Sequence, residues 1–193
     1  MNKSNLALNE EGLRLLAVPD TPFALLELGM GNGGLVPDWL ARYPGLSYTG
    51  VDFSPLMVEQ ALAINAEAVT AGWARFLLGE AHALPVESAA FDAVFTANTI
   101  YFWPDPQAVL REFCRVLKPG GVLLMALRSE ETMKALPFTE HGFTRYSRAR
   151  LEALMAASPF GTSPIHTFHE DMRTDAAGNT YPSYNFLVRA VKA

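Results

Sequence analysis

Apolar and polar positions alternate in blocks along this chain, and the blocks predict strands and helices in turn. Short apolar runs, typical of buried strands, lie at 23–28, 46–51, 75–78, 93–96 and 122–127. Apolar residues recur at helical spacing in the stretches between and before them, at 9–18, 33–43, 54–70 and 105–117. Strands that alternate with helices in this way predict a parallel sheet covered by helices.

Two of these helices have explicit start signals. Ser54-Pro55 and Asp105-Pro106 each place a capping side chain directly before a proline at the first helical position. The second of these helices is expected to stop at Lys118-Pro119-Gly120-Gly121, because proline and glycine do not continue a helix.

The last third of the chain has a different character. Residues 129–146 are expected to be irregular and to form a lid over the site, and Ser147 is expected to cap a further helix. Two extended stretches follow, at 164–172 and 181–191, with turn residues between them at 175–179. This pattern predicts an antiparallel hairpin at the end of the sheet.

Length and composition favour one globular domain over residues 1–193, with an N-terminal helical region at 1–22. The net charge is −5 and there is no basic block, which argues against nucleic acid as the main partner. Arg145, Arg148 and Arg150 are interpreted as a solvated helix start.

Cysteine content and hydropathy limit the class of protein further. Cys114 is the single cysteine, so it forms no intramolecular disulfide and no cysteine-based metal cluster, and its apolar neighbours predict a buried, inert thiol. No apolar stretch has the length of a signal peptide or of a membrane span, which takes about 18 residues. The sequence therefore predicts a cytoplasmic protein that is not in the membrane.

The most informative segment follows the first predicted strand. Glu27 lies near the end of that strand, and glycines follow at Gly29, Gly31 and Gly33. Glycines let a backbone turn sharply and approach a ligand, because they lack Cβ. The next strand ends in Asp52, an acid well placed to hold a ribose through its hydroxyls. Together these features predict binding of an adenosine-containing small molecule.

Five segments in order resemble the motifs of class I S-adenosylmethionine (SAM) dependent methyltransferases, most closely the small-molecule branch of the ubiquinone-biosynthesis type. They are residues 27–33, 50–57, 78–85, 91–94 and 117–121. The resemblance implies a Rossmann-like, doubly wound α/β fold with a seven-stranded sheet, mostly parallel with a terminal antiparallel hairpin. It also implies SAM as cofactor and a small-molecule acceptor for the methyl group.

The resemblance further implies roles for residues around the cofactor. Glu27 would orient the loop and the amino end of SAM, Asp52 would accept from the ribose hydroxyls, and the helix after the loop would offer free N–H groups to the carboxylate. The remaining expected cofactor-binding residues are Gly29, Gly31 and Gly33 for close approach, Phe53 and Met57 beside the adenine, Glu80 and Ala81 at the adenine edge, and Asn98 and Thr99 along the methionine portion.

The acceptor side is less defined. Tyr101 and Trp103 are expected to bind the acceptor as walls of an apolar pocket, although aromatics of this segment could instead pack on the sheet. No catalytic residue is assigned: His141, Tyr146, His166 and His169 are candidate bases that nothing places near the methyl group. No metal is expected, because the methyl of a sulfonium is already activated.

Alternatives remain open at this point. G-x-G-x-x-G is also satisfied by Gly29, Gly31 and Gly34, so an NAD-dependent dehydrogenase is a rival, which Glu27 and Glu80 disfavour. A non-catalytic SAM-binding protein and an interaction module are further rivals. Because only about 22 residues precede the first strand, the pocket is expected to be open, to be completed by a second copy in a homodimer, or to take a large acceptor.

Overall fold

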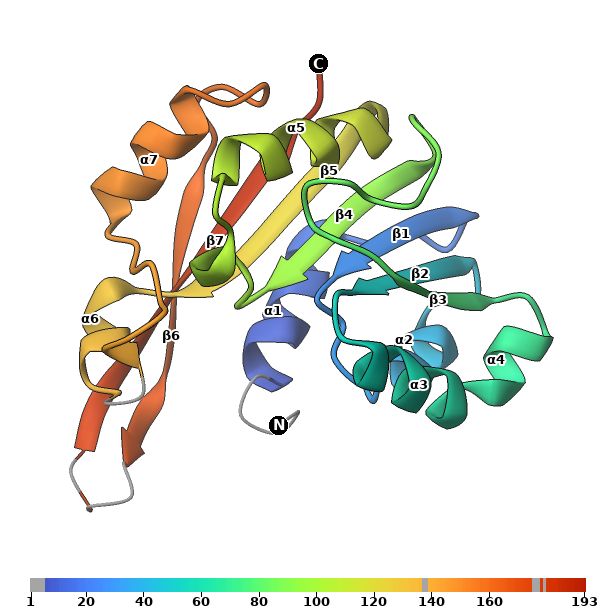
Figure 1. The fold of residues 1–193 in the computed structure, drawn as a ribbon, viewed down its shortest axis with the longest axis horizontal. Helices are drawn as coiled ribbons and strands as arrows, with labels where there is room; N and C mark the ends of the chain where they lie inside the picture. Colours follow the sequence, from blue (N-terminus) through green and yellow to red (C-terminus); the bar gives the residue numbers. More distant parts are fainter. Residues whose placement is uncertain (1–5, 137–138, 175–177, 179) are drawn as a thin grey trace.

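A computed structural model describes residues 6–136, 139–174, 178 and 180–193. Its centre is one seven-stranded sheet in the order β3-β2-β1-β4-β5-β7-β6 (Figure 1). The pairings of β1 with β2 and β4, of β2 with β3 and of β4 with β5 are parallel, whereas β7 is antiparallel to both β5 and β6. The strands are β1 Phe23–Leu28, β2 Leu46–Asp52, β3 Ala74–Leu78, β4 Phe91–Ala97, β5 Leu117–Arg128, β6 Ile165–Thr174 and β7 Thr180–Val191. The predicted fold class is therefore confirmed.

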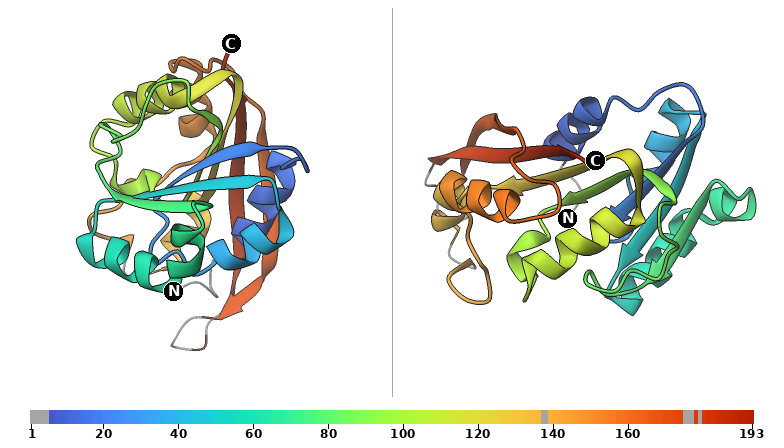
Figure 2. Two further views of the ribbon diagram at one scale, coloured as in Figure 1. Left: turned by 90° about the vertical axis from the view of Figure 1, so that its right-hand side faces the viewer. Right: turned by 90° about the horizontal axis from the view of Figure 1, so that it is seen from above.

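Helices cover the sheet on both sides. Figure 2 shows α1 and α2 on one side of the sheet and α5 and α7 on the other. The helices are α1 Leu6–Leu16, α2 Val36–Arg42, α3 Pro55–Ile64, α4 Ala66–Thr70, α5 Pro106–Val116, α6 Glu130–Lys134 and α7 Arg148–Ala156, with the 3₁₀ turn η2 at Ile100–Phe102. None of these helices is long and apolar enough to cross a membrane, within the residues that the structure describes.

The apolar strands serve two cores at once. Successive side chains of a strand point to opposite faces, and Leu25 packs with the α1 and α2 side while Leu26 packs with the α5 and α7 side. Leu124 and Leu123 divide in the same way in β5. Burial of both faces explains why these strands are continuous apolar runs and do not alternate.

The predicted caps are confirmed. The Ser54 Oγ accepts from the backbone N–H of Met57 at 3.4 Å, and the Asp105 carboxylate accepts from that of Ala108 at 3.1 Å. The Ser147 Oγ accepts in the same way at the start of α7. Each cap satisfies one of the N–H groups that a helix start leaves without a partner.

Some boundaries differ from the prediction. The helix predicted over 54–70 is interrupted at Asn65, whose side-chain Nδ2 donates to the carbonyls of Gly33 and Ala61. The helix α5 does end before residues 118–121, as expected. These residues belong to the strand β5, and Lys118 forms an ion pair there with Asp92 at 2.8 Å.

Two further expectations need correction. Residues 129–146 are not wholly irregular, because Ser129 caps the short helix α6. Cys114 is half-buried, so the prediction of a fully buried thiol is wrong. The predicted turn at 175–179 lies outside the described residues apart from Gly178.

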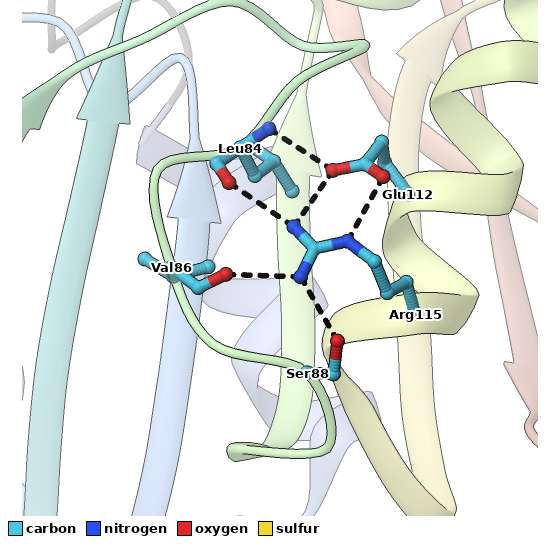
Figure 3. Close-up of polar contacts among 5 residues, drawn as sticks. All are labelled: Leu84, Val86, Ser88, Glu112 and Arg115. Carbon is cyan, nitrogen blue, oxygen red and sulfur yellow. Dashed lines mark hydrogen bonds and ion pairs between the residues drawn. The ribbon is translucent and has the colours of Figure 1, made fainter.

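The connection from β3 to β4, residues 79–90, contains no helix and is held by side chains of α5 instead (Figure 3). Arg115 donates to the carbonyls of Leu84 and Val86, each at 3.0 Å, and to Ser88 Oγ at 3.2 Å. Glu112 accepts from the Leu84 N–H at 3.0 Å and pairs with the same guanidinium. The Arg115 guanidinium holds the pKa of Glu112 below its ordinary value. This network holds residues 84–88, which follow Glu80 in the same connection.

Candidate cofactor site

Three loops meet at the carboxyl edge of the parallel strands. β1 is followed by the glycine loop, 29–34, β2 ends at Asp52, and β4 leads into Asn98. β1 lies between β2 and β4 in the sheet. Open α/β sheets bind ligands at such a point, where consecutive strands continue to opposite sides.

The glycine loop adopts a backbone that only glycine takes readily. Gly29 has φ +76°, and a Cβ at this position would lie 2.3 Å from the Thr99 Cγ2. Gly33 has φ +64°, and its Cβ would lie 3.0 Å from the Asn65 side chain. Gly31 has φ +58° with no atom within 4 Å of its missing Cβ, so its outer side is open. The loop is packed from behind and accessible in front.

Asp52 joins the glycine loop to the end of β2. Its Oδ2 accepts from the Gly31 N–H and its Oδ1 from the Ser54 N–H, both at 3.0 Å, and the residue is 5% exposed. The capping of α3 is done by Ser54, so Asp52 is not the helix cap. An ionised carboxylate has about four acceptor positions, so both oxygens keep capacity for further donors. Its ribose contact stays a prediction.

Glu27 is buried beside the loop, at 7% exposure, and accepts from the Tyr48 hydroxyl at 2.5 Å. Burial raises the pKa of Glu27 to about 7, with the Asp52 charge adding to the rise and the Tyr48 hydrogen bond opposing it. Glu27 therefore changes its charge near neutral pH. Tyr48 was missed by the sequence reasoning, and its signal is a hydroxyl within the apolar strand next to Glu27.

A pocket of about 90 Å³ opens between Glu27 and the glycine loop. Its lining includes the expected Glu27, Gly29, Gly31 and Gly33, and also Asn9 and Ala97. Asn9 and Ala97 were missed by the sequence reasoning. Asn9 was detectable only as a polar residue among the apolar positions of the first predicted helix.

The expectation of free N–H groups at the helix after this loop is wrong for several of them. The N–H groups of Gly33, Gly34 and Val36 donate within the loop, to Met30 O, Asn32 Oδ1 and Gly33 O. The loop folds back on itself in tight turns, and these turns use the donors that an extended approach to α2 would have left free.

The predicted adenine residues lie at the ends of β2 and β3. Phe53 is 73% exposed and Met57, in the first turn of α3, is half-buried. Glu80 is exposed and Ala81 half-buried, in a tight turn where the Ala83 N–H donates to the Glu80 carbonyl at 3.1 Å. The exposed faces of these residues suit a flat ring, and their roles stay predictions.

Asn98 and Thr99 follow β4 at the same edge. Asn98 has φ +58°, a conformation that asparagine tolerates better than most residues. Its Oδ1 accepts from the Tyr101 hydroxyl at 2.9 Å. The Thr99 hydroxyl is 2.6 Å from that of Thr96, and its methyl group fills the space behind Gly29. Thr99 thus supports the glycine loop from behind.

The two predicted acceptor residues are both buried. Tyr101 is 4% exposed, its hydroxyl accepts from the Arg128 N–H at 2.5 Å, and burial raises its pKa. Trp103 is 6% exposed and packs edge-on against Phe113 of α5 at 5.6 Å. The placement of Trp103 fits the packing alternative. Its acceptor role stays a prediction.

The segment after α6 does contact this region. The Thr144 N–H donates to the Tyr101 carbonyl at 3.0 Å, and the Phe143 ring lies 4.7 Å from that of Phe102. Candidate bases are not brought to the pocket, because none of His141, Tyr146, His166 and His169 lines it. No group of three or more metal-ligating residues occurs in the part of the chain that the structure describes.

Comparisons with known proteins agree with this geometry. A family model described as a methyltransferase domain matches residues 26–125. The malonyl-[acyl-carrier protein] O-methyltransferase of Hahella chejuensis is 32% identical over 132 residues, 68% of this chain and 46% of that protein. The demethylmenaquinone methyltransferase of Thermus thermophilus is 37% identical over 110 residues, 57% of this chain and 49% of that protein. The chain thus spans about half the length of these curated relatives.

A solved structure extends the likeness to the whole fold. A Haloferax volcanii protein in a complex with the Trm112 methyltransferase activator superposes with a TM-score of 0.81. It covers 99% of this chain and 91% of its own, at 23% sequence identity. At this identity the likeness concerns the fold.

Proposed function

We propose that this chain, which belongs to the class I SAM-dependent methyltransferase family, transfers a methyl group from SAM to a small-molecule acceptor. The family match and the names of the relatives support a methyltransferase, and SAM is the methyl donor that this family implies. The family match at 26–125 contains every cofactor-binding residue predicted from the sequence.

The observation that carries the proposal is the connection between Asp52 and the glycine loop. The Gly31 N–H donates to Asp52, so the loop and the acid at the end of β2 form one unit. The open side of Gly31 and the pocket beside Glu27 adjoin this unit. An acid for a ribose and a pocket with a carboxylate for an ammonium group suit the two ends of SAM.

The chain's own contribution is binding and alignment. Bound SAM supplies a methyl group on a sulfonium, whose leaving group is a neutral thioether. Asp52 would hold the ribose, Phe53 and Met57 would flank the adenine, and Glu80 with Ala81 would contact its edge. Gly29 and Thr99 would set the position of the methionine portion. Fixing two reactants in line accounts for a large part of such a rate enhancement.

The acceptor is proposed to lie beside the segment after β4. Phe102 is 56% exposed and stacks edge-on with the half-buried Phe143, so residues 139–146 and η2 share an apolar surface. We propose this surface, with Tyr101 beneath it, as the acceptor side and residues 129–146 as its lid. An apolar aromatic surface suits a partly apolar acceptor.

The test is calorimetry with S-adenosylhomocysteine, the demethylated product, and with NAD. The wild-type chain should bind S-adenosylhomocysteine and not NAD. Asp52→Asn should weaken binding by about 1–3 kcal/mol, since one acceptor for a hydroxyl becomes a donor. Asp38→Asn, on an exposed turn of α2, is the matched control. Binding of NAD alone would overturn the proposal.

Turnover separates an enzyme from a non-catalytic SAM-binding protein. Methyl-labelled SAM should be combined with a demethylmenaquinone analogue and with a malonyl thioester, chosen from the relatives' substrates. Transfer to either one, unaffected by a chelator, supports the proposal. Product binding without transfer to any acceptor in a wider panel favours the non-catalytic alternative.

A homodimer is the remaining part of the proposal. β3 is an edge strand of the sheet, and Trp73 at its start is 61% exposed, with Leu78 at its end 53% exposed. Exposed apolar residues at a sheet edge favour pairing with another chain. Light scattering should report a mass of about twice the 21.1 kDa of the chain. The mass of a single chain would overturn the proposed homodimer without affecting the proposal of methyl transfer.

A further inference from the structure

One residue that lines the pocket has a buried polar atom without a partner among the residues that the structure describes. Asn9 of α1 is 8% exposed, and its Oδ1 accepts no hydrogen bond from them. Buried amide oxygens without partners are uncommon and costly. Asn65 and Asn185 also have such atoms, but neither residue lines the pocket, whereas Asn9 does. A ligand bound in the pocket could therefore supply the hydrogen-bond donor that the Asn9 Oδ1 lacks.

The position of Asn9 is fixed by the packing of α1. Gly12, one turn further along the helix, lies so close to the sheet that a Cβ would come within 2.7 Å of the Phe95 ring. Leu8 and Leu13 are buried on the same side of the sheet. Because α1 approaches β4 this closely, Asn9 is held at the pocket wall.

We propose that the Asn9 Oδ1 accepts a hydrogen bond from the α-ammonium group of SAM, which makes Asn9 a cofactor-binding residue. Asn9 and Glu27 both line one small pocket, and the buried Asn9 Oδ1 accepts no hydrogen bond from the described residues. A group that reaches both must donate at least two hydrogen bonds. The ammonium group of the methionine portion has three N–H donors, and its positive charge matches the ionised form of Glu27. This inference rests on the proposed function, because it concerns the same cofactor.

The environment of Glu27 agrees with this assignment. Burial raises the pKa of Glu27 to about 7, so the surrounding protein does not favour its charged form. A cation placed between Glu27 and Asn9 would stabilise the ionised form. The amide of Asn9 adds an acceptor that carries no charge, so it adds no repulsion against Glu27.

The experiment compares two ligands on the variant Asn9→Leu. S-adenosylhomocysteine carries the amino-acid portion, and 5′-methylthioadenosine carries the adenosine and sulfur without it. Asn9→Leu should weaken S-adenosylhomocysteine binding about tenfold or more, the effect of losing a hydrogen bond to a charged group. Its affinity for 5′-methylthioadenosine should stay that of the wild type. Calorimetry measures both.

Stability gives a second readout. Asn9→Leu should melt at or above the wild-type temperature without ligand, since it replaces an unpaired buried amide by an apolar side chain of similar size. A structural role for Asn9 would lower the melting temperature instead. Asn185→Leu, a buried unpaired amide outside the pocket, is the matched control and should leave both affinities unchanged.

The outcomes are distinguishable. If Asn9→Leu does not fold, Asn9→Ala is measured in the same way, with the same expected contrast between ligands. Equal weakening of both ligands, or unchanged S-adenosylhomocysteine affinity, overturns the role of Asn9 and leaves the proposed function standing. Failure of the wild-type chain to bind either ligand overturns the proposed function itself.

Discussion

The loop after β1 and the segment after β4 lie at the same edge of one sheet, yet they are built differently. The glycine loop is held by backbone groups: the Gly29 N–H donates to the Val51 carbonyl and the Gly31 N–H to Asp52. The segment after β4 is held by side chains, through the Tyr101 hydroxyl and the contact between Trp103 and Phe113. The first region is positioned mainly through its backbone N–H groups, and the second through aromatic side chains.

This difference explains why one region is recognisable and the other is not. A backbone with φ above zero at alternate positions admits few residues other than glycine, so the loop carries a fixed pattern. Aromatic packing admits many combinations of similar volume. The glycine loop, which belongs to the proposed cofactor half of the site, therefore carries a recognisable sequence motif. The segment after β4, in the proposed acceptor half, is marked only by its content of aromatic residues.

The largest expected effect tests whether Trp103 belongs to the core or to the acceptor site. Trp103→Ala should lower the free energy of unfolding by about 3–5 kcal/mol, because it leaves a cavity against Phe113. Ile64→Ala, at an exposed position of α3 outside the edge strand β3, should change it little. Urea denaturation measures both. A stable Trp103→Ala variant that loses turnover would instead place Trp103 in the acceptor pocket.

The second prediction separates backbone strain from crowding in the glycine loop. Gly29→Ala should cost about 2–4 kcal/mol of stability, since strain at positive φ adds to the clash with Thr99. Gly72→Ala shares the φ of +76° but has open space around it, so it should cost only about 1–2 kcal/mol. Denaturation midpoints give the two values. Equal losses would mean that Thr99 moves aside and does not support the loop.

The third prediction concerns the link between the two regions through Tyr101. Its hydroxyl joins Asn98, at the end of β4, to the backbone of Arg128, at the end of β5. Tyr101→Phe removes the hydrogen bonds to these two half-buried residues and should cost about 1–3 kcal/mol. Phe102→Leu, nearby and exposed, is the control. If Tyr101→Phe is neutral in stability and slows turnover alone, Tyr101 faces the acceptor.

The elements of the cofactor half were largely predictable because each of them has a recognisable pattern over a few consecutive residues. Glu27 lies near the end of one apolar strand, Asp52 ends the next, and Ser54-Pro55 starts a helix, so three elements were placed within a few residues. The break at Asn65 was not predictable, because it depends on a hydrogen bond to Gly33, far away in sequence.

The pocket contributions of Asn9 and Ala97 were not predictable for the same reason. Both depend on how α1 packs across β4, and this packing is a tertiary property that helical spacing does not encode. The expectation of free N–H groups before α2 was wrong for Gly33, Gly34 and Val36, because turn hydrogen bonds inside the glycine loop use these donors. The local sequence pattern predicts each helix or strand. Contacts between residues far apart in the sequence decide which of its polar groups are free to bind a ligand.

The last prediction is that stability and ligand binding depend on pH through Glu27 in the cofactor half. The acceptor half should contribute no such dependence. The pKa of Glu27 rises from 4.5 to about 7 on burial, so the folded chain keeps a proton that the unfolded chain has lost between these values. The stability due to this proton is present below pH 4.5 and is lost as pH rises to 7. Glu27→Gln should remove this part of the pH dependence.

Ligand affinity should follow the opposite trend, because an ammonium group prefers the ionised carboxylate. S-adenosylhomocysteine should bind about tenfold more tightly at pH 8 than at pH 6, which is about 1.4 kcal/mol. Tyr48→Phe removes a hydrogen bond that lowers the pKa of Glu27, so it should move the midpoint of this profile to higher pH. Glu59→Gln, on an exposed part of α3, should leave the profile as it is. A flat profile in the wild type would show that Glu27 does not contact the amino end, and the backbone loop would then bind the cofactor without help from its acid.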